Sequence, residues 1–170
     1  DMALLVEDAQ VARQRAQALG ANPFSQRLAK GELDIPAIRG VGGSVLHFVD
    51  HKSELRAIWE TDFEALTARD TEANTAGLLR IDHVAQTMNA EEMLTWTLFY
   101  TSIFEMIKTP MVDSVDPNGM VYSRAIQSGD GGVRLILNGT ETHRTFAGRF
   151  VADSSGPSVQ HLAFASDDIF

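Results

Sequence analysis

Three short stretches of the chain are alike: Asp1-Met-Ala-Leu-Leu-Val-Glu-Asp8, His83-Val-Ala-Gln86 and His161-Leu-Ala-Phe-Ala-Ser-Asp-Asp168. In each, a polar leading residue is followed by an apolar residue and then alanine, which is an alternation typical of a strand. Two of the three continue into paired acids, which favour the first turn of a helix. A stretch that recurs in this way predicts one supersecondary unit that the chain uses more than once.

Two of the copies carry a histidine at the leading position, His83 and His161. Equivalent strands of a pseudo-symmetric scaffold would carry these histidines to equivalent places, although 161 − 83 = 78 residues separate them. The chain has no cysteine, so its possible metal ligands are His, Asp and Glu. The pattern therefore predicts a site for a hard or borderline metal ion. Asp1, at the same position of the remaining copy, predicts a structural module.

Composition and charge exclude two classes of partner. A chain of 170 residues that is 44% hydrophobic forms one domain or two small ones. Its net charge of −9 and its pI near 4.9 disfavour binding to a nucleic-acid backbone. No apolar run approaches the roughly 20 residues that span a bilayer. The first residues lack a basic segment followed by an apolar one, so we expect a cytoplasmic setting.

Alternation and turn residues divide the chain into units that start with a strand and continue into a helix. The first unit has expected strands at residues 2–6, 33–39 and 43–50 and an expected helix at residues 9–19. The second has expected strands at residues 79–86, 106–115, 120–128 and 133–138 and an expected helix at residues 90–104. A further unit starts near Val159. Because the chain then begins and ends inside units, we expect a segment of a longer protein.

Four motifs carry a resemblance to a known family: Ile81-Asp-His-Val84, Ser123-Arg-Ala-Ile126, Val133-Arg-Leu-Ile-Leu-Asn138 and Gly156-Pro-Ser-Val-Gln-His161. Together they resemble the vicinal oxygen chelate superfamily and, more narrowly, 4-hydroxyphenylpyruvate dioxygenase and its relatives. The resemblance implies an α+β fold of repeated βαβββ modules, with curved mixed sheets and flanking helices.

The same resemblance implies a domain organisation. Residues 1–50 would form the second module of a non-catalytic N-terminal half. Residues 51–78 would form a linker, in which Trp59, Phe63 and Leu66 could hold a short helix. Residues 79–170 would form the first module of the metal-binding half and the start of its second module.

In that family two histidines and one glutamate hold the metal, leaving positions for a 2-oxo acid and dioxygen. The resemblance makes His83 and His161 metal ligands and places the glutamate beyond Phe170. Ser123, Asn138 and Gln160 match positions that line the family's substrate pocket. We therefore expect a divalent metal, Fe(II) first and Mg, Mn or Co as alternatives, and a small aromatic or 2-oxo acid as partner. Exposed module edges predict a homodimer or a higher homo-oligomer.

One segment departs from the dioxygenases. They carry a glutamine that faces the substrate shortly after the position of Asn138, whereas residues 139–150 contain none. Together with residues 31–43, 59–63 and 143–145, this segment resembles the C-terminal half of bacterial fused 3-dehydroshikimate dehydratases. In those proteins a TIM-barrel dehydratase domain precedes a dioxygenase-like half.

Three hypotheses follow. The first is an Fe(II)-dependent dioxygenase that acts on an aryl 2-oxo acid such as 4-hydroxyphenylpyruvate. The second, which we favour, is the dioxygenase-like half of a 3-dehydroshikimate dehydratase of aromatic (quinate–shikimate) catabolism, inactive by itself. The third is a non-enzymatic module that binds a small molecule.

Other residues have simpler interpretations. We expect His47 and His51 to lie at the surface. For His143, a solvated position in a loop is favoured over a contact with the substrate. The stripe Met93, Leu94, Trp96, Leu98 and Phe99 is expected to face the core rather than a cofactor.

Overall fold

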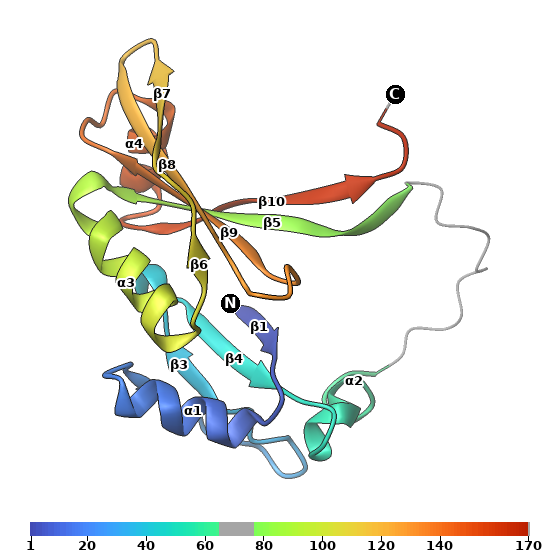
Figure 1. Cartoon of the computed structure of the whole chain (residues 1–170). Coiled ribbons are helices and arrows are strands. Elements are labelled where there is room, and N and C mark those ends of the chain that lie inside the picture. The colour runs from blue at the N-terminus through green and yellow to red at the C-terminus, as the bar shows by residue number, and fades with distance from the viewer. Residues whose placement is uncertain (65–76, 170) are drawn as a thin grey trace. The chain divides into compact units, whose positions relative to one another are not determined.

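The structure, a computed structural model, describes residues 1–64 and 77–169. The chain divides into two compact units, Asp1–Thr75 and Ala76–Phe170. Each unit has its own mixed β-sheet with flanking helices (Figure 1). Among the described residues, no helix is both long enough and apolar enough to cross a membrane.

The first unit is a four-stranded sheet in the order β1-β4-β3-β2, in which β1 and β4 are parallel. Its strands are β1 (Met2–Leu5), β2 (Pro23–Phe24), β3 (Ala37–Arg39) and β4 (Val45–Val49). Its helical elements are α1 (Ala9–Ala18), η1 (Val41–Gly43), η2 (Glu54–Ala57) and α2 (Ile58–Thr61). Ile38, Leu46 and Phe48 are fully buried and form the centre of its core.

Two aspartates hold the first helix of this unit in place. Asp8 is the N-cap of α1, and its Oδ1 accepts a hydrogen bond from the Val11 amide at 2.9 Å. The buried Asp50 accepts one from the Ala9 amide at 2.9 Å and thereby ties the start of α1 to the end of β4. Asp1 Oδ1 accepts a bond from the Val45 amide at 3.2 Å and so links the start of the chain to the start of β4.

The second unit is a six-stranded sheet in the order β10-β5-β9-β8-β6, and β7 also pairs with β8. Its strands are β5 (Leu78–Asn89), β6 (Ile107–Lys108), β7 (Val112–Asp116), β8 (Gly119–Gln127), β9 (Arg134–Thr140) and β10 (Ser158–Ser166). Its helical elements are η3 (Ala90–Glu92), α3 (Met93–Ile103) and α4 (Phe146–Asp153).

The two units repeat one topology. In each, the first strand lies parallel to the last strand of its βαβββ module, as β1 with β4 and β5 with β9. The remaining neighbours within each module are antiparallel. Met2 is paired with Leu46 and Val84 with Leu135, so Asp1 and His83 precede equivalent positions. The predicted α+β fold of repeated modules is therefore confirmed.

Helix α3 packs against one face of the second sheet. The buried Tyr100 hydroxyl donates to Gln86 Oε1 at 2.8 Å. Met93 fills the space that a side chain at Gly139 would need, so β9 approaches the start of the helix closely. Because side chains alternate along a strand, residues 84, 86 and 88 of β5 face α3, and residues 83, 85 and 87 face the other side.

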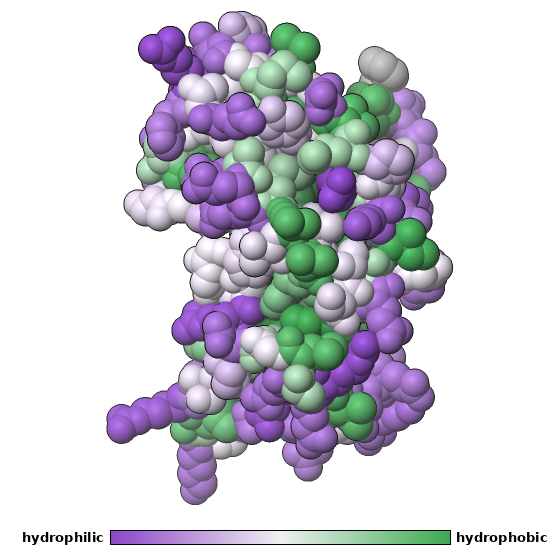
Figure 2. Space-filling model, turned by 60° about the vertical axis from the view of Figure 1, so that its left-hand side comes forward, coloured by the Kyte–Doolittle hydropathy of each residue, from purple (hydrophilic) through white to green (hydrophobic). Residues whose placement is uncertain are grey.

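The predicted core stripe of α3 is wrong in part. Met93 is buried, but Leu94 and Leu98 are 64% and 51% exposed. The helix instead buries Met93, Thr97, Tyr100 and Ile103. Apolar side chains thus reach the surface among hydrophilic ones, as Figure 2 shows for one face of the molecule.

Other expectations differ from the structure in extent. The strand expected at residues 33–39 is reduced to β3, and helix α4 was not expected at all. His47 is half-buried on β4 and meets the ring of Phe24 edge-on at 6.4 Å, so its expected surface position is wrong. The expected linker, residues 51–78, begins with η2 and α2. Its residues 65–76, Leu66 among them, lie outside the described part of the chain.

Candidate metal and substrate site

Antiparallel pairing of β5 with β10 places His83 and His161 side by side. Ala163 is paired with His83 and His161 with Ala85, so the histidines sit on neighbouring strands, two positions apart. Their ring centroids are 5.7 Å apart, with 74° between the ring planes. Two ligands of one ion must lie within a few ångström of each other, and this pair meets that requirement.

A carboxylate orients one ring of the pair. Asp82 Oδ2 lies 2.9 Å from His83 Nδ1, and Arg134 donates to Asp82 Oδ1 at 3.3 Å. The hydrogen bond with His83, and to a lesser degree the charge of Arg134, hold the pKa of Asp82 below its ordinary value. With Nδ1 engaged, Nε2 of His83 is the nitrogen left to bind an ion. A carboxylate bonded to the second nitrogen is the usual support for a histidine ligand.

The three expected substrate-binding residues line one cavity of about 390 Å³. Ser123 of β8 is paired with Asn138 of β9, and its hydroxyl donates to Asn138 Oδ1 at 2.6 Å. Gln160 of β10 reaches the same cavity. The residue lies at an irregularity in the pairing with β5, between Val159 and His161. The structure thus collects residues from three strands around one space.

The histidine pair and this cavity share a face of the sheet. Gly139 faces α3, so its neighbour Asn138 points to the opposite side, as does Ser123 opposite Asn138. His83 alternates with Gln86 in the same way and also points away from α3. Neither histidine is among the residues that line this cavity, so the structure places the pair and the cavity on one face without joining them into one pocket.

The sequence did not predict that α4 and β7 line part of this cavity. Phe146 and Ala147 of α4 and Asp116 of β7 line it. Asp116 accepts hydrogen bonds from the amides of Asn118, at 2.9 Å, and Phe146, at 3.1 Å, which lower its pKa. Asp116 therefore fixes the start of α4. The available signal was Thr145, whose hydroxyl caps the helix by accepting from the Gly148 amide at 3.0 Å.

Two imidazoles, those of His83 and His161, are the candidate ligands that the structure brings together. Within residues 1–64 and 77–169, no group of three or more His, Asp and Glu side chains could hold an ion. Nitrogen donors favour Fe(II) or Co(II) over Mg(II), which prefers oxygen. His143 is exposed and lines a different cavity from Ser123, Asn138 and Gln160.

Comparison with known proteins agrees with the family resemblance found in the sequence. Residues 1–64 match the model of the N-terminal domain of hydroxyphenylpyruvate dioxygenase. The chain is 40% identical over 168 residues to a 3-dehydroshikimate dehydratase of Pseudomonas aeruginosa, covering 99% of this chain and 26% of that protein. It is 34% identical over 171 residues to a 4-hydroxyphenylpyruvate dioxygenase of a Pseudomonas species, covering 99% of this chain and 47% of that protein.

A solved structure agrees with these relatives. A fusion protein of a xylose isomerase-like TIM barrel and a 4-hydroxyphenylpyruvate dioxygenase superposes with a TM-score of 0.69 at 35% identity. The match covers 98% of this chain and 26% of the fusion protein. The chain is thus similar to 4-hydroxyphenylpyruvate dioxygenase-like proteins of the vicinal oxygen chelate type, as predicted. Within that class, the predicted resemblance to the 3-dehydroshikimate dehydratases is also confirmed.

Proposed function

We propose that this chain is a segment of the dioxygenase-like part of a 3-dehydroshikimate dehydratase of aromatic catabolism. In this part, His83 and His161 provide two ligands of a divalent metal site that takes Fe(II). The identity of 40% and 38% to two such dehydratases, each over 99% of this chain, supports the parentage. The histidine pair, 5.7 Å apart on one face of the sheet, is the observation that carries the metal site.

The chain's own residues have separable tasks in this proposal. Asp82 orients His83, and Arg134 holds Asp82. Ser123, Asn138 and Gln160 offer hydroxyl and amide groups to the polar atoms of a small acid. A bound divalent ion would supply a Lewis-acidic centre for the acid's oxygen atoms.

A metal titration of the tag-free chain tests the pair. Co(II) is added alone, and the side-chain imidazole signals of the five histidines are followed by NMR. We expect the His83 and His161 signals to broaden first. His83→Ala and His161→Ala should each weaken binding by at least about tenfold, and Asp82→Asn by about tenfold, since outer partners of ligands contribute 10 to 100-fold.

The control is His51→Ala, because His51 is exposed and belongs to the first unit. This variant should bind Co(II) as the unchanged chain does. The metal site is contradicted if broadening is spread equally over all five histidines. It is also contradicted if the His83→Ala and His161→Ala variants bind Co(II) as tightly as the unchanged chain does.

The parentage is tested on the complete polypeptide that carries this sequence. A dehydratase parent with a TIM barrel exceeds a two-half dioxygenase by about 250 residues, which the intact mass reveals. The complete dehydratase should dehydrate 3-dehydroshikimate. The His83→Ala variant should keep the same turnover, because the barrel catalyses this reaction. A mass without a barrel removes this parentage.

The second candidate is an Fe(II)-dependent dioxygenase that acts on an aryl 2-oxo acid. The 34% identity to a 4-hydroxyphenylpyruvate dioxygenase over 99% of this chain favours it. Oxygen uptake by the iron-loaded complete protein with 4-hydroxyphenylpyruvate would establish this activity, and loss of uptake in His161→Ala would link it to the site. A homo-oligomer and a cytoplasmic location stay predictions from the sequence.

A further inference from the structure

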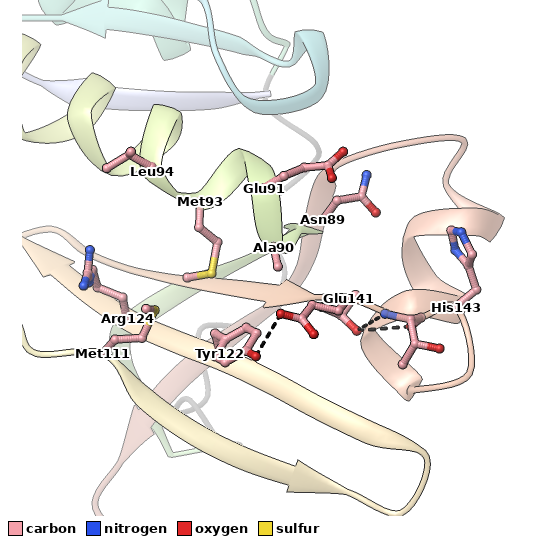
Figure 3. A pocket seen from close by; sticks show the side chains of 12 residues that line it. Asn89, Ala90, Glu91, Met93, Leu94, Met111, Tyr122, Arg124, Glu141 and His143 are labelled. Atoms are coloured by element: carbon pink, nitrogen blue, oxygen red, sulfur yellow. Dashed lines mark hydrogen bonds between the residues drawn. The ribbon is translucent and has the colours of Figure 1, made fainter.

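A second, larger cavity lies in the same unit and has no role in the proposed function. Its volume is about 860 Å³, and it is an open cavity lined by η3, the start of α3, β8 and the end of β9 with the turn that follows (Figure 3). Sites for small molecules usually measure 300 to 1,000 Å³, so the space is large enough for one.

This cavity is separate from the candidate metal and substrate site. Tyr122 and Arg124 of β8 line it, whereas Ser123 between them lines the smaller cavity. Because successive side chains of a strand point to opposite faces, the two cavities lie on opposite faces of one sheet. A ligand in the larger cavity therefore leaves the histidine pair accessible.

Opposite charges mark the two ends of the larger cavity. Arg124 lies at one end beside Met111, and the Glu141 carboxylate lies beyond Tyr122, on the side toward His143 (Figure 3). Glu91 of η3 is a second carboxylate in the lining. The Nε atom of Arg124 is buried and has no hydrogen-bond partner in the described part of the chain. Glu141 Oε1 accepts a bond from the Tyr122 hydroxyl at 3.0 Å, which directs the carboxylate toward the space. An arginine Nε–H without an acceptor favours an anion beside the guanidinium, and the Glu141 carboxylate favours a cation.

The spacing of these ends is set by the strand register. Arg124 is paired with Leu137 and Val121 with Thr140, so Glu141 lies four positions along the sheet from Arg124. At about 3.4 Å per residue this corresponds to roughly 14 Å between their backbones, and the long side chains can bring the charged groups closer together. Met93, Leu94 and Met111 offer apolar surface to the space between.

We propose that this cavity binds a small zwitterion whose carboxylate meets Arg124 and whose ammonium group meets Glu141. The part of the ligand between its charges is aliphatic and lies along Met93 and Met111. A ligand with one charge alone would satisfy one end and leave the other charge without a counterpart.

Four probes of matched chemistry test this assignment on the full chain. 6-Aminohexanoate carries both charges on a five-carbon spacer, hexanoate keeps the anion, hexylammonium keeps the cation, and glycine keeps both charges without the spacer. Backbone amide shifts of the ¹⁵N-labelled chain give the site and the affinity of each probe. We expect 6-aminohexanoate to shift Tyr122, Arg124 and Glu141 and to bind at least about tenfold more tightly than the other three.

Two variants and one control complete the test. Arg124→Gln and Glu141→Gln should each weaken binding of 6-aminohexanoate by about tenfold or more, whereas Arg80→Gln, on the exposed start of β5, should leave it unchanged. The amide spectra of the variants establish that they fold. The proposal is overturned if 6-aminohexanoate shifts no residue of this cavity, if hexanoate or glycine binds equally well, or if folded Arg124→Gln keeps full affinity.

Discussion

In the variant Gly148→Ala, helix propensity and packing have opposite effects on the stability of the second unit. Gly148 lies inside α4, where exchange of glycine for alanine would stabilise a free helix by about 1 kcal/mol. A Cβ atom at this position would instead overlap the Thr142 carbonyl oxygen and lie 2.7 Å from His143 Cα. Both are backbone atoms that cannot rotate away. An overpacking cost of about 3 kcal/mol less the gain of about 1 leaves a loss of roughly 2 kcal/mol in the unfolding free energy of the second unit.

Urea unfolding measures this loss. The two tryptophans fall in different units, Trp59 in the first and Trp96 in the second. In a Trp59→Phe background, fluorescence therefore reports on the second unit alone. The matched control is Gly129→Ala, because a Cβ there meets no atom within 4 Å. The control should stay within about 0.5 kcal/mol. A Gly148→Ala chain as stable as the control would refute the close approach of α4 to the preceding turn.

Two further predictions concern buried polar groups. Tyr100→Phe should lower the unfolding free energy of the second unit by about 1 to 3 kcal/mol, because the buried Gln86 Oε1 loses its donor; an unchanged urea midpoint of Trp96 fluorescence would contradict this. Amides of Ala9 and Ser53 lower the pKa of Asp50 to about 2. The stabilisation is thus present above the ordinary carboxyl pKa near 4 and is lost as the pH falls toward 2. Asp50→Asn should remove this part of the pH dependence of unfolding, followed through Trp59, and a curve that keeps its slope would argue against the Asp50 bonds.

The starts of both modules could be predicted because their signals are local. Asp8 and Asn89, residues of the types that cap helices, stand directly before α1 and η3. Asp8 accepts a bond from the Val11 amide, and Asn89 forms a capping box with Glu92. Alternation of apolar residues likewise located β1, β5 and β10. These features depend on residues a few positions apart, and sequence patterns record such relations directly.

The buried face of α3 could not be predicted in the same way. Leucines, aromatic residues and a methionine occur on all sides of this helix, so its hydrophobicity does not indicate which face is buried. Its orientation depends on a polar pair, Tyr100 with Gln86 of β5, which buries Tyr100 and Thr97 and leaves Leu94 and Leu98 exposed. Helix α4 escaped detection for a related reason. Its eight residues include Gly148, and the Thr145 cap and the contacts of the fold stabilise it more than its propensity does.

The sequence by itself determined the chemistry available to this protein: histidines as the nitrogen ligands, no thiol, and a module that recurs. The tertiary structure alone decided which groups meet. His83 approaches His161 because β5 and β10 pair antiparallel with a continuous register from His161 to Ala163, and a shift by one residue there would turn a ring to the other face. Arg124 and Glu141 share a cavity because β8 and β9 align them along one face. Such relations join residues far apart in the chain, so only the folded sheet creates them.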